Sequence, residues 1–173
     1  MDPGTADPSG SAPRRVRLAP LPAERLPGWI ASSQADYVDD LLRAGEDRAV
    51  ALVKAARAFE DYFAGGAPPQ GHHVYDVIDG AEPVGSLWLG PQPGGSADAW
   101  WVWDITIDAG QRGRGLGRLA MTLAEDEVRR HGGTTLGLSV FGFNAAARGL
   151  YASLGYQTRS IQMFKTLEER TTT

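Results

Sequence analysis

The sequence of 173 residues contains no cysteine. This absence excludes disulfide bonds, thiolate metal ligands and a cysteine nucleophile together. The sequence also has no apolar run near the roughly 18 to 20 residues that a membrane-spanning helix needs, and its N-terminus lacks the apolar core of a signal peptide. We therefore expect a cytoplasmic protein without a membrane partner.

An excess of basic residues is missing as well. Lys and Arg number 17 against 21 Asp and Glu, which gives a formal net charge of −4. A basic surface is the usual electrostatic requirement for binding nucleic acid, so no nucleic-acid partner is expected. The hydrophobic content of 42% and the length fit one globular domain, expected at residues 15–167. Residues 1–14 are rich in Pro, Gly, Ser and Ala and predict a flexible tail, and residues 168–173 predict a second tail.

What the sequence does contain is a stretch of alternating glycines and arginines at residues 111–118, where an apolar strand pattern gives way to a helical one. The first backbone N–H groups of a helix have no intrahelical partner, and the helix dipole adds positive charge there, so an anion is stabilised. Glycine lets a ligand approach the backbone, and arginine adds charge-assisted hydrogen bonds. The stretch predicts a phosphate-binding loop, with an ordinary glycine-rich turn as the alternative.

The spacing of the glycines separates three nucleotide-binding patterns. The dinucleotide-binding pattern would need glycine at Arg118. A P-loop starting at Gly110 would need Lys and then Ser or Thr at the positions of Leu116 and Gly117. The pattern that fits is [Q/R]-x-x-G-x-[G/A], at residues 112–117.

The periodicity of apolar residues predicts the order strand, two helices, three strands, helix, strand, helix, strand. The strands are expected at residues 16–18, 73–78, 84–89, 99–107, 134–140 and 156–165, and the helices near residues 29–42, 49–63, 116–131 and 144–154. A strand-helix-strand crossover around the glycine loop places one parallel pair in an otherwise antiparallel sheet. The fold class is therefore mixed α+β.

A second signature lies at residues 144–156 and reads N-x-x-A-x-x-x-Y-x-x-x-G-[FY]. Together with the glycine loop, it makes the chain similar to the GNAT N-acetyltransferase superfamily over residues 17–165. The resemblance implies the GNAT fold, with a mostly antiparallel central sheet, one parallel crossover and helices on both faces. It implies acetyl-CoA as co-substrate, no metal, and a primary amine of a small molecule or peptide as acceptor. Homodimers are frequent in the family, so a homodimer is one expected assembly.

The resemblance also assigns residues to the donor site. The backbone of Ile105, Thr106 and Ile107 would lie along the pantetheine arm, although the two isoleucines are also ordinary core residues. The coenzyme pyrophosphate would bind at the loop formed by Arg112, Gly113, Arg114, Gly115, Leu116, Gly117 and Arg118.

Asn144 and Tyr151 are seven residues apart and so share one face of a helix. By resemblance, Asn144 binds the coenzyme while also capping the helix, and Tyr151 lies near the thioester sulfur as the general acid. A phenol is protonated at neutral pH and can supply that proton. The alternative for Tyr151 is a half-buried core residue.

The general base is not given by the resemblance, because Ser139 stands where some relatives carry a glutamate. Asp104 is the preferred substitute, since it lies on the strand expected to flank the thioester; a solvated acid on an exposed face is the alternative. Weaker candidates are Asp76, Glu82, His72, His73 and a chain of water molecules.

The acceptor itself is not identified by the sequence. Trp29 and Tyr37 lie in the first helical region, which in relatives forms one wall of the acceptor cleft, so both are predicted to contact the acceptor. The alternative function is a non-catalytic module that binds or senses acetyl-CoA. Tyr151 and Asn144 weigh against that alternative, whereas Ser139 favours it.

Overall fold

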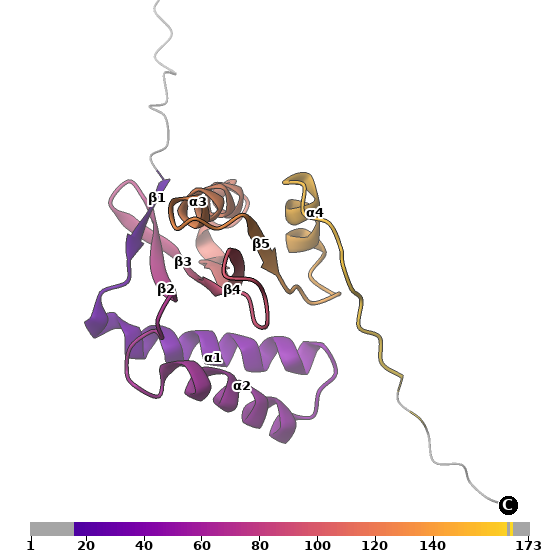
Figure 1. Ribbon diagram of the computed structural model, residues 1–173. Coiled ribbons are helices and arrows are strands. Elements are labelled where there is room, and N and C mark those ends of the chain that lie inside the picture. Colours follow the sequence, from indigo (N-terminus) through magenta and orange to yellow (C-terminus); the bar gives the residue numbers. More distant parts are fainter. Residues whose placement is uncertain (1–15, 166, 168–173) are drawn as a thin grey trace, which may run out of the picture.

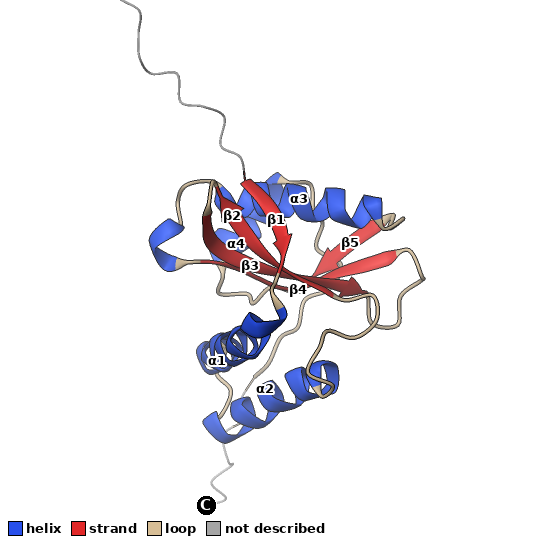
Figure 2. Cartoon of the chain, turned by 90° about the vertical axis from the view of Figure 1, so that its left-hand side faces the viewer, coloured by secondary structure: helices blue, strands red, loops and turns tan. Residues whose placement is uncertain are grey.

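The computed structural model of the protein describes residues 16–165 and 167. The tails predicted at residues 1–14 and 168–173 lie outside these residues. Within the described chain, a five-stranded sheet forms the central layer, and helices cover both of its faces (Figures 1 and 2). This arrangement confirms the mixed α+β fold expected from the sequence.

The sheet is antiparallel except at one edge. Its strands are β1 (Val16–Pro20), β2 (His73–Asp79), β3 (Glu82–Pro91), β4 (Ala99–Ile107) and β5 (Thr135–Leu138). They lie side by side in chain order, and only the β4–β5 pair is parallel. That pair is joined through a helix, as a parallel connection requires.

Two helices cover one face of the sheet: α1 (Leu26–Arg43), which follows a short 3-10 turn at Ala23–Arg25, and α2 (Arg48–Phe63). The Asp47 carboxylate caps α2 by accepting hydrogen bonds from the backbone N–H groups of Ala49 and Val50, which satisfies donors that a helix start leaves unpaired. Aromatic side chains fill the space between these helices and the sheet. They include Trp29, Phe59, Phe63 and Trp88.

The other face is covered by α3 (Leu116–Arg130) and α4 (Ala145–Ser153) (Figure 2). The apolar positions of α3 recur at helical spacing, so one stripe of the helix is buried on the sheet. Its buried members include Leu116, Ala120, Met121, Ala124 and Val128, which pack against Leu87 and Leu89 of β3. Side chains of β4, α3 and α4 thus belong to one core.

The strand predicted at residues 156–165 is not formed; this part of the described chain is extended but pairs with no strand. The strand predicted at residues 134–140 is also shorter than expected, because β5 ends at Leu138. Gly155, at φ +91°, ends α4 and turns the chain outward, so the following residues run away from the sheet (Figure 1). The residue pattern of a segment can favour an extended backbone, but a strand in a sheet also needs a neighbouring strand close enough to form hydrogen bonds with it.

Candidate active site

The strands β4 and β5 stop pairing partway along β4, and this leaves an opening in the sheet beyond the end of β5. Residues Ala99 to Val102 of β4 pair with Thr135 to Leu138 of β5, and β4 then continues to Ile107 beyond the end of β5. The side chains of Ile105 and Ile107 pack against the core under α3, whereas Thr106 lines a cleft beneath α1. The backbone predicted to flank the pantetheine arm therefore lies at the opening, while its isoleucine side chains serve the core.

The glycine loop leads into the N-terminus of α3. Gly113 and Gly115 have φ angles of +75° and +79°, a conformation that costs other residues energy. Gly115 is the N-cap residue, no side chain caps the helix there, and its first turn carries no acidic residue. The positive end of α3 and its first N–H groups are thus left for an anion, which fits a phosphate group.

The three arginines of the loop make contacts within the protein. The Arg112 Nε group donates to the Ile107 carbonyl oxygen at 2.9 Å, and Arg114 donates to the Asp79 carboxylate at 2.9 Å. Arg118 donates to the Ser153 hydroxyl on α4. In this structure the guanidinium groups brace the loop against β4, β2 and α4, and their contact with phosphates stays a prediction from the sequence. The backbone of the loop and the N-terminus of α3 remain uncapped by any side chain, as a binding site for an anion requires.

Asn144 and Tyr151 lie at the start and near the end of α4. The Asn144 Oδ1 atom accepts a hydrogen bond from the Ala147 N–H group at 3.1 Å, which confirms its predicted capping role. Tyr151 is buried, with its ring 5.9 Å from that of Tyr156. Burial raises the pKa of the Tyr151 phenol, and the negative charge of Asp104 raises it further. Tyr151 therefore stays protonated at neutral pH.

Asp104 lies on β4 between α1 and the opening. Its carboxylate accepts a hydrogen bond from the Ser33 hydroxyl at 2.9 Å. The side chain retains some contact with solvent but is densely surrounded by protein. This burial, reinforced by the charges of Asp36 and Asp40, raises the pKa of Asp104 to about 6, although hydrogen bonds from Ser33 and the Ile105 backbone oppose the shift. A carboxylate with this pKa is suited to accept a proton near neutral pH.

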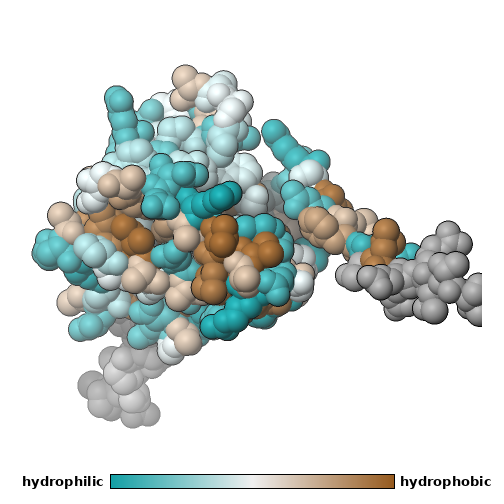
Figure 3. Space-filling view, turned by 90° about the horizontal axis from the view of Figure 1, so that it is seen from below, coloured by the Kyte–Doolittle hydropathy of each residue, from teal (hydrophilic) through white to brown (hydrophobic). Residues whose placement is uncertain are grey.

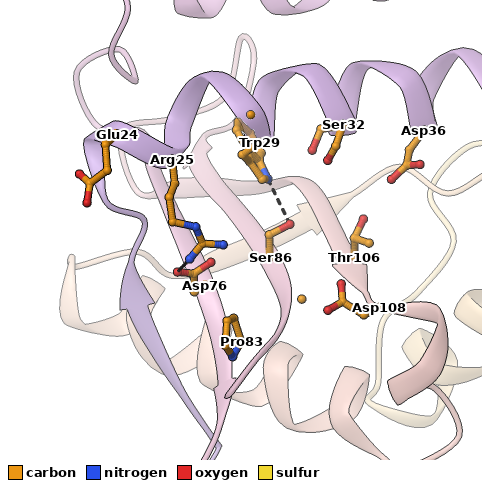
Figure 4. Close-up of a pocket in the computed structure, with 13 residues that line it drawn as sticks. Glu24, Arg25, Trp29, Ser32, Asp36, Asp76, Pro83, Ser86, Thr106 and Asp108 are labelled. Carbon is orange, nitrogen blue, oxygen red and sulfur yellow. Dashed lines mark hydrogen bonds and ion pairs between the residues drawn. The ribbon is translucent and has the colours of Figure 1, made fainter. Parts of the chain in front are cut away.

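A cleft of about 470 Å³ lies between α1 and strands β2 to β4 (Figure 4), within the size range of small-molecule sites. Trp29, Ser33 and Asp36 project into it from α1, and Ser86 and Thr106 from the sheet. The Trp29 indole N–H donates to the Ser86 hydroxyl at 3.1 Å, fixing the ring over the floor. Because Ser33 also holds Asp104, the cleft reaches the candidate base.

The charges of the cleft are predominantly negative. Four carboxylates line it, those of Glu24, Asp36, Asp76 and Asp108, against the single guanidinium of Arg25. Arg25 is already paired with Asp76 at 2.6 Å. Figure 4 shows Glu24 and Asp76 toward one end and Asp36 and Asp108 toward the other. The electrostatic potential of the cleft therefore favours a cationic ligand.

Tyr37, one of the two residues predicted to contact the acceptor, does not line the cleft. Its ring packs 6.4 Å from that of Phe141 and joins the contacts between α1 and α2. Sequence reasoning instead missed Ser33 and Asp36. Both follow Trp29 at helical spacing, i+4 and i+7, so polar residues on an otherwise buried face of α1 were the available signal.

The weaker base candidates lie in other surroundings. Asp76 lines the cleft but is held by Arg25, and Glu82 is exposed at the start of β3. His72 accepts a hydrogen bond from the Trp88 indole at 3.1 Å, and burial lowers its pKa. His73 stacks between aromatic rings near the end of α3. Asp104 is the candidate that is hydrogen-bonded to Ser33 of the cleft and whose charge also raises the pKa of Tyr151.

Comparison with known proteins agrees with this arrangement. Residues 35–156 match the Acetyltransferase (GNAT) family. The chain belongs to this family. GNAT enzymes use acetyl-CoA as co-substrate, and the opened β4–β5 pair with the uncapped start of α3 fits that molecule.

Two GNAT relatives come from Bacillus subtilis strain 168. The uncharacterised N-acetyltransferase YycN is 26% identical over 157 residues, which cover 88% of this chain and 99% of YycN. The uncharacterised N-acetyltransferase YdgE is 30% identical over 68% of this chain and 75% of its own. The crystal structure of YycN superposes with a TM-score of 0.83 at 25% identity, covering 90% of this chain and all of that one.

A more distant solved structure shares the fold alone. It is AAC(6')-Iy in complex with the bisubstrate analogue CoA-S-monomethyl-acetylneamine, with a TM-score of 0.56 at 11% identity over 89% of this chain and 99% of that one.

In the described part of this GNAT chain, no helix is long and apolar enough to cross a membrane.

Proposed function

We propose that the protein is an N-acetyltransferase that moves the acetyl group of acetyl-CoA to a primary amine by direct attack. Asp104 is the general base and Tyr151 the general acid. The observation that carries the proposal is the position of Asp104: it is held by Ser33 of the cleft on one side and interacts electrostatically with Tyr151 on the other. These two interactions support a site in which the base acts between the acceptor cleft and the acid.

The groups present can perform each step of the transfer. Asp104 takes a proton from the bound ammonium group, and the neutral amine attacks the thioester carbon. A backbone N–H group among Ile105, Thr106 and Ile107 stabilises the developing oxyanion. The C–N bond forms and the C–S bond breaks. Tyr151 donates its proton to the sulfur and regains one from the nitrogen of the new amide.

The charge of the cleft supports a cationic acceptor of small size. An amine arrives in water as an ammonium ion, and the carboxylates of the cleft favour that form until Asp104 removes the proton. Acidic side chains at both ends favour an acceptor with a second ammonium group, such as a diamine. A zwitterionic amino acid would bring its own carboxylate against Asp36 or Glu24, which is unfavourable.

An assay of free thiol release tests the activity. Purified protein is incubated with acetyl-CoA and, separately, 1,4-diaminobutane, 1-aminobutane, an amino acid or no acceptor, and the acetylated product is identified by mass spectrometry. We expect turnover with amines and the highest kcat/KM with the diamine. Tight coenzyme binding without turnover of any amine would favour the non-catalytic sensor, for which Ser139 in place of a glutamate is the supporting feature.

A charge substitution tests the role of the cleft in acceptor binding. Asp36→Asn should raise the KM for 1,4-diaminobutane by roughly five- to tenfold, because tenfold corresponds to about 1.4 kcal/mol, the scale of one partly screened charge contact. Asp39→Asn is the matched control: it removes the same charge from the same helix at an exposed position outside the cleft. Equal effects of both variants would reduce the finding to general surface charge and contradict an acidic acceptor cleft.

A further inference from the structure

The loop between β5 and α4, residues 139–144, packs against the C-terminal half of α1 through two phenylalanine rings. The Phe141 ring lies 6.4 Å from that of Tyr37 and joins the contacts between α1 and α2. Phe143 stacks on Phe141 at 5.4 Å, and the guanidinium carbon of Arg43 lies 4.3 Å from the centre of the Phe143 ring, within the range of a cation–π interaction. These contacts connect the loop to α1 beyond the last paired residues of β4 and β5 (Figure 1).

The same loop is joined to the start of α4 by hydrogen bonds. The Asn144 N–H group donates to the Phe141 carbonyl oxygen at 3.0 Å. The Arg148 guanidinium, one turn into α4, donates to the Gly142 carbonyl oxygen at 3.1 Å. The loop and the first turn of α4 therefore form one unit, and this unit contains Asn144, the residue expected to bind the coenzyme.

The two ends of α4 are held in different ways. Later in the helix, Ala147, Leu150 and Tyr151 pack against the core under α3. Residues 144–146, at its start, are exposed. The core thus fixes the C-terminal half of α4, whereas the position of its start depends on the loop.

The helix that receives the loop also lines the acidic cleft. Tyr37 follows Ser33 by four residues and Asp36 by one residue along α1. Ser33 donates its hydrogen bond to Asp104, and Asp36 lines the cleft. Because hydrogen bonds join each turn of an α-helix to the next, Tyr37 moves together with this wall of the cleft.

We propose that Tyr37, Phe141 and Phe143 are positioning residues, and that this aromatic strap couples the coenzyme site at the start of α4 to the wall of the cleft on α1. Coenzyme bound at Asn144 orders the loop, and the ring contacts pass this order to α1. Coupling of this kind is reciprocal, so a ligand in the cleft also favours binding of the coenzyme. The inference rests on the coenzyme site and the cleft of the proposed function, but on neither its base nor its acid.

Hydrogen exchange of the full chain with and without acetyl-CoA tests the coupling. In the wild type, acetyl-CoA should slow exchange at residues 113–118 and also at residues 34–43 of α1. In the double variant Phe141→Ala, Phe143→Ala, the slowing should persist at residues 113–118, which shows that coenzyme is bound, but disappear at residues 34–43. Loss of packing alone would speed exchange in α1 with and without acetyl-CoA and leave the difference intact. Absence of the α1 effect in the wild type, or its persistence in the double variant, would overturn the proposal.

Three further variants separate the strap from general packing. Phe141→Tyr, Phe143→Tyr keeps both rings and should retain the slowing in α1. Val140→Ala is the matched control on the same loop, where this side chain is 36% exposed. Figure 3 looks from below onto α1 and α2 and shows apolar side chains on this face, and Val53 of α2 is 52% exposed. Val53→Ala is therefore the matched control in the helical layer. Loss of the α1 effect in either valine variant would assign it to packing and refute the strap.

Titration with acetyl-CoA gives a second measurement of the coupling. The double alanine variant should bind acetyl-CoA about fivefold more weakly than the wild type, at the lower end of typical couplings between sites. The double tyrosine variant should stay within about twofold. Equal affinity of the wild type and the double alanine variant would contradict the strap. Neither measurement needs turnover, so a protein that acetylates no amine still shows the coupling, and a failed strap leaves the thiol-release assay unaffected.

Discussion

Asp104 sets the expected pH dependence of catalysis at the scale of single residues. Its carboxyl must be ionised to act as a base, and its pKa is raised to about 6. We expect kcat/KM for the amine to fall about tenfold per pH unit below that value. Ser33→Ala removes a hydrogen bond that lowers this pKa, so the acidic limb of the pH profile should move to higher pH. If the acidic limb of the kcat/KM profile lies at the same pH in the wild type and in Ser33→Ala, Asp104 is not the base.

The same carboxyl affects stability. Its folded-state pKa of about 6 lies above the ordinary value of 3.8. Asp104 therefore favours the folded state at pH below about 4 and loses that contribution as pH rises through 6. Asp104→Asn, which cannot ionise, should raise the unfolding free energy by about 1 to 3 kcal/mol at pH 8. Urea unfolding at pH 8 and pH 4 measures this, and an equal gain at both pH values would assign the effect to packing rather than ionisation.

Tyr151 is the residue whose hydroxyl group the proposed mechanism requires. Tyr151→Phe keeps the buried ring but removes the proton donor, so turnover should fall by roughly 10²-fold. Affinity for acetyl-CoA, measured by calorimetry, should stay within about twofold. Tyr156→Phe is the control, since it removes a phenol of the same cluster whose pKa is likewise raised by burial. Unchanged turnover of Tyr151→Phe would remove this residue from the acid role.

At the scale of elements, the junction of the glycine loop with α3 is the place where we propose that the coenzyme pyrophosphate binds. Gly115 has φ +79° at the uncapped N-terminus of α3. Gly115→Ala should cost about 1 to 2 kcal/mol of stability and weaken acetyl-CoA binding by distorting the anion site. Gly149→Ala is the matched control: it lies inside α4 with no atom within 4 Å of an added Cβ, and should be neutral or stabilise by about 0.5 to 1 kcal/mol. Thermal unfolding of both variants measures the change in stability, and titration with acetyl-CoA measures the change in affinity.

Assembly is the property that belongs to the whole molecule. A homodimer is one assembly expected from the resemblance to the family, and dimerisation adds to the stability of the folded state by mass action. The Tm of the protein should then rise with protein concentration between about 1 and 100 μM. A concentration-independent Tm in differential scanning fluorimetry would speak against a stable homodimer.

Local patterns identified most of the architecture because the governing interactions are short-range. The alternation of Ala99 to Ile107 predicted β4 with the bounds observed, and the apolar stripe after Gly115 predicted α3. Trp29 was predicted to contact the acceptor, and it lines the cleft. Ser33 and Asp36 were missed because their role depends on how α1 lies across the sheet, which the spacing along one helix does not determine.

The sequence by itself determined the family, and it predicts the donor loop and the candidate acid, because glycine conformation, helix termini and the spacing of Asn144 and Tyr151 are local properties. Only the tertiary structure decided what lies between distant elements. In the folded chain, Ser33 of α1 donates a hydrogen bond to Asp104 of β4, and four carboxylates line one cleft. Tyr37 packs against Phe141 outside this cleft. It also left residues 156–165 outside the sheet, because strand pairing requires a partner in space, and α4 directs this segment away from β5.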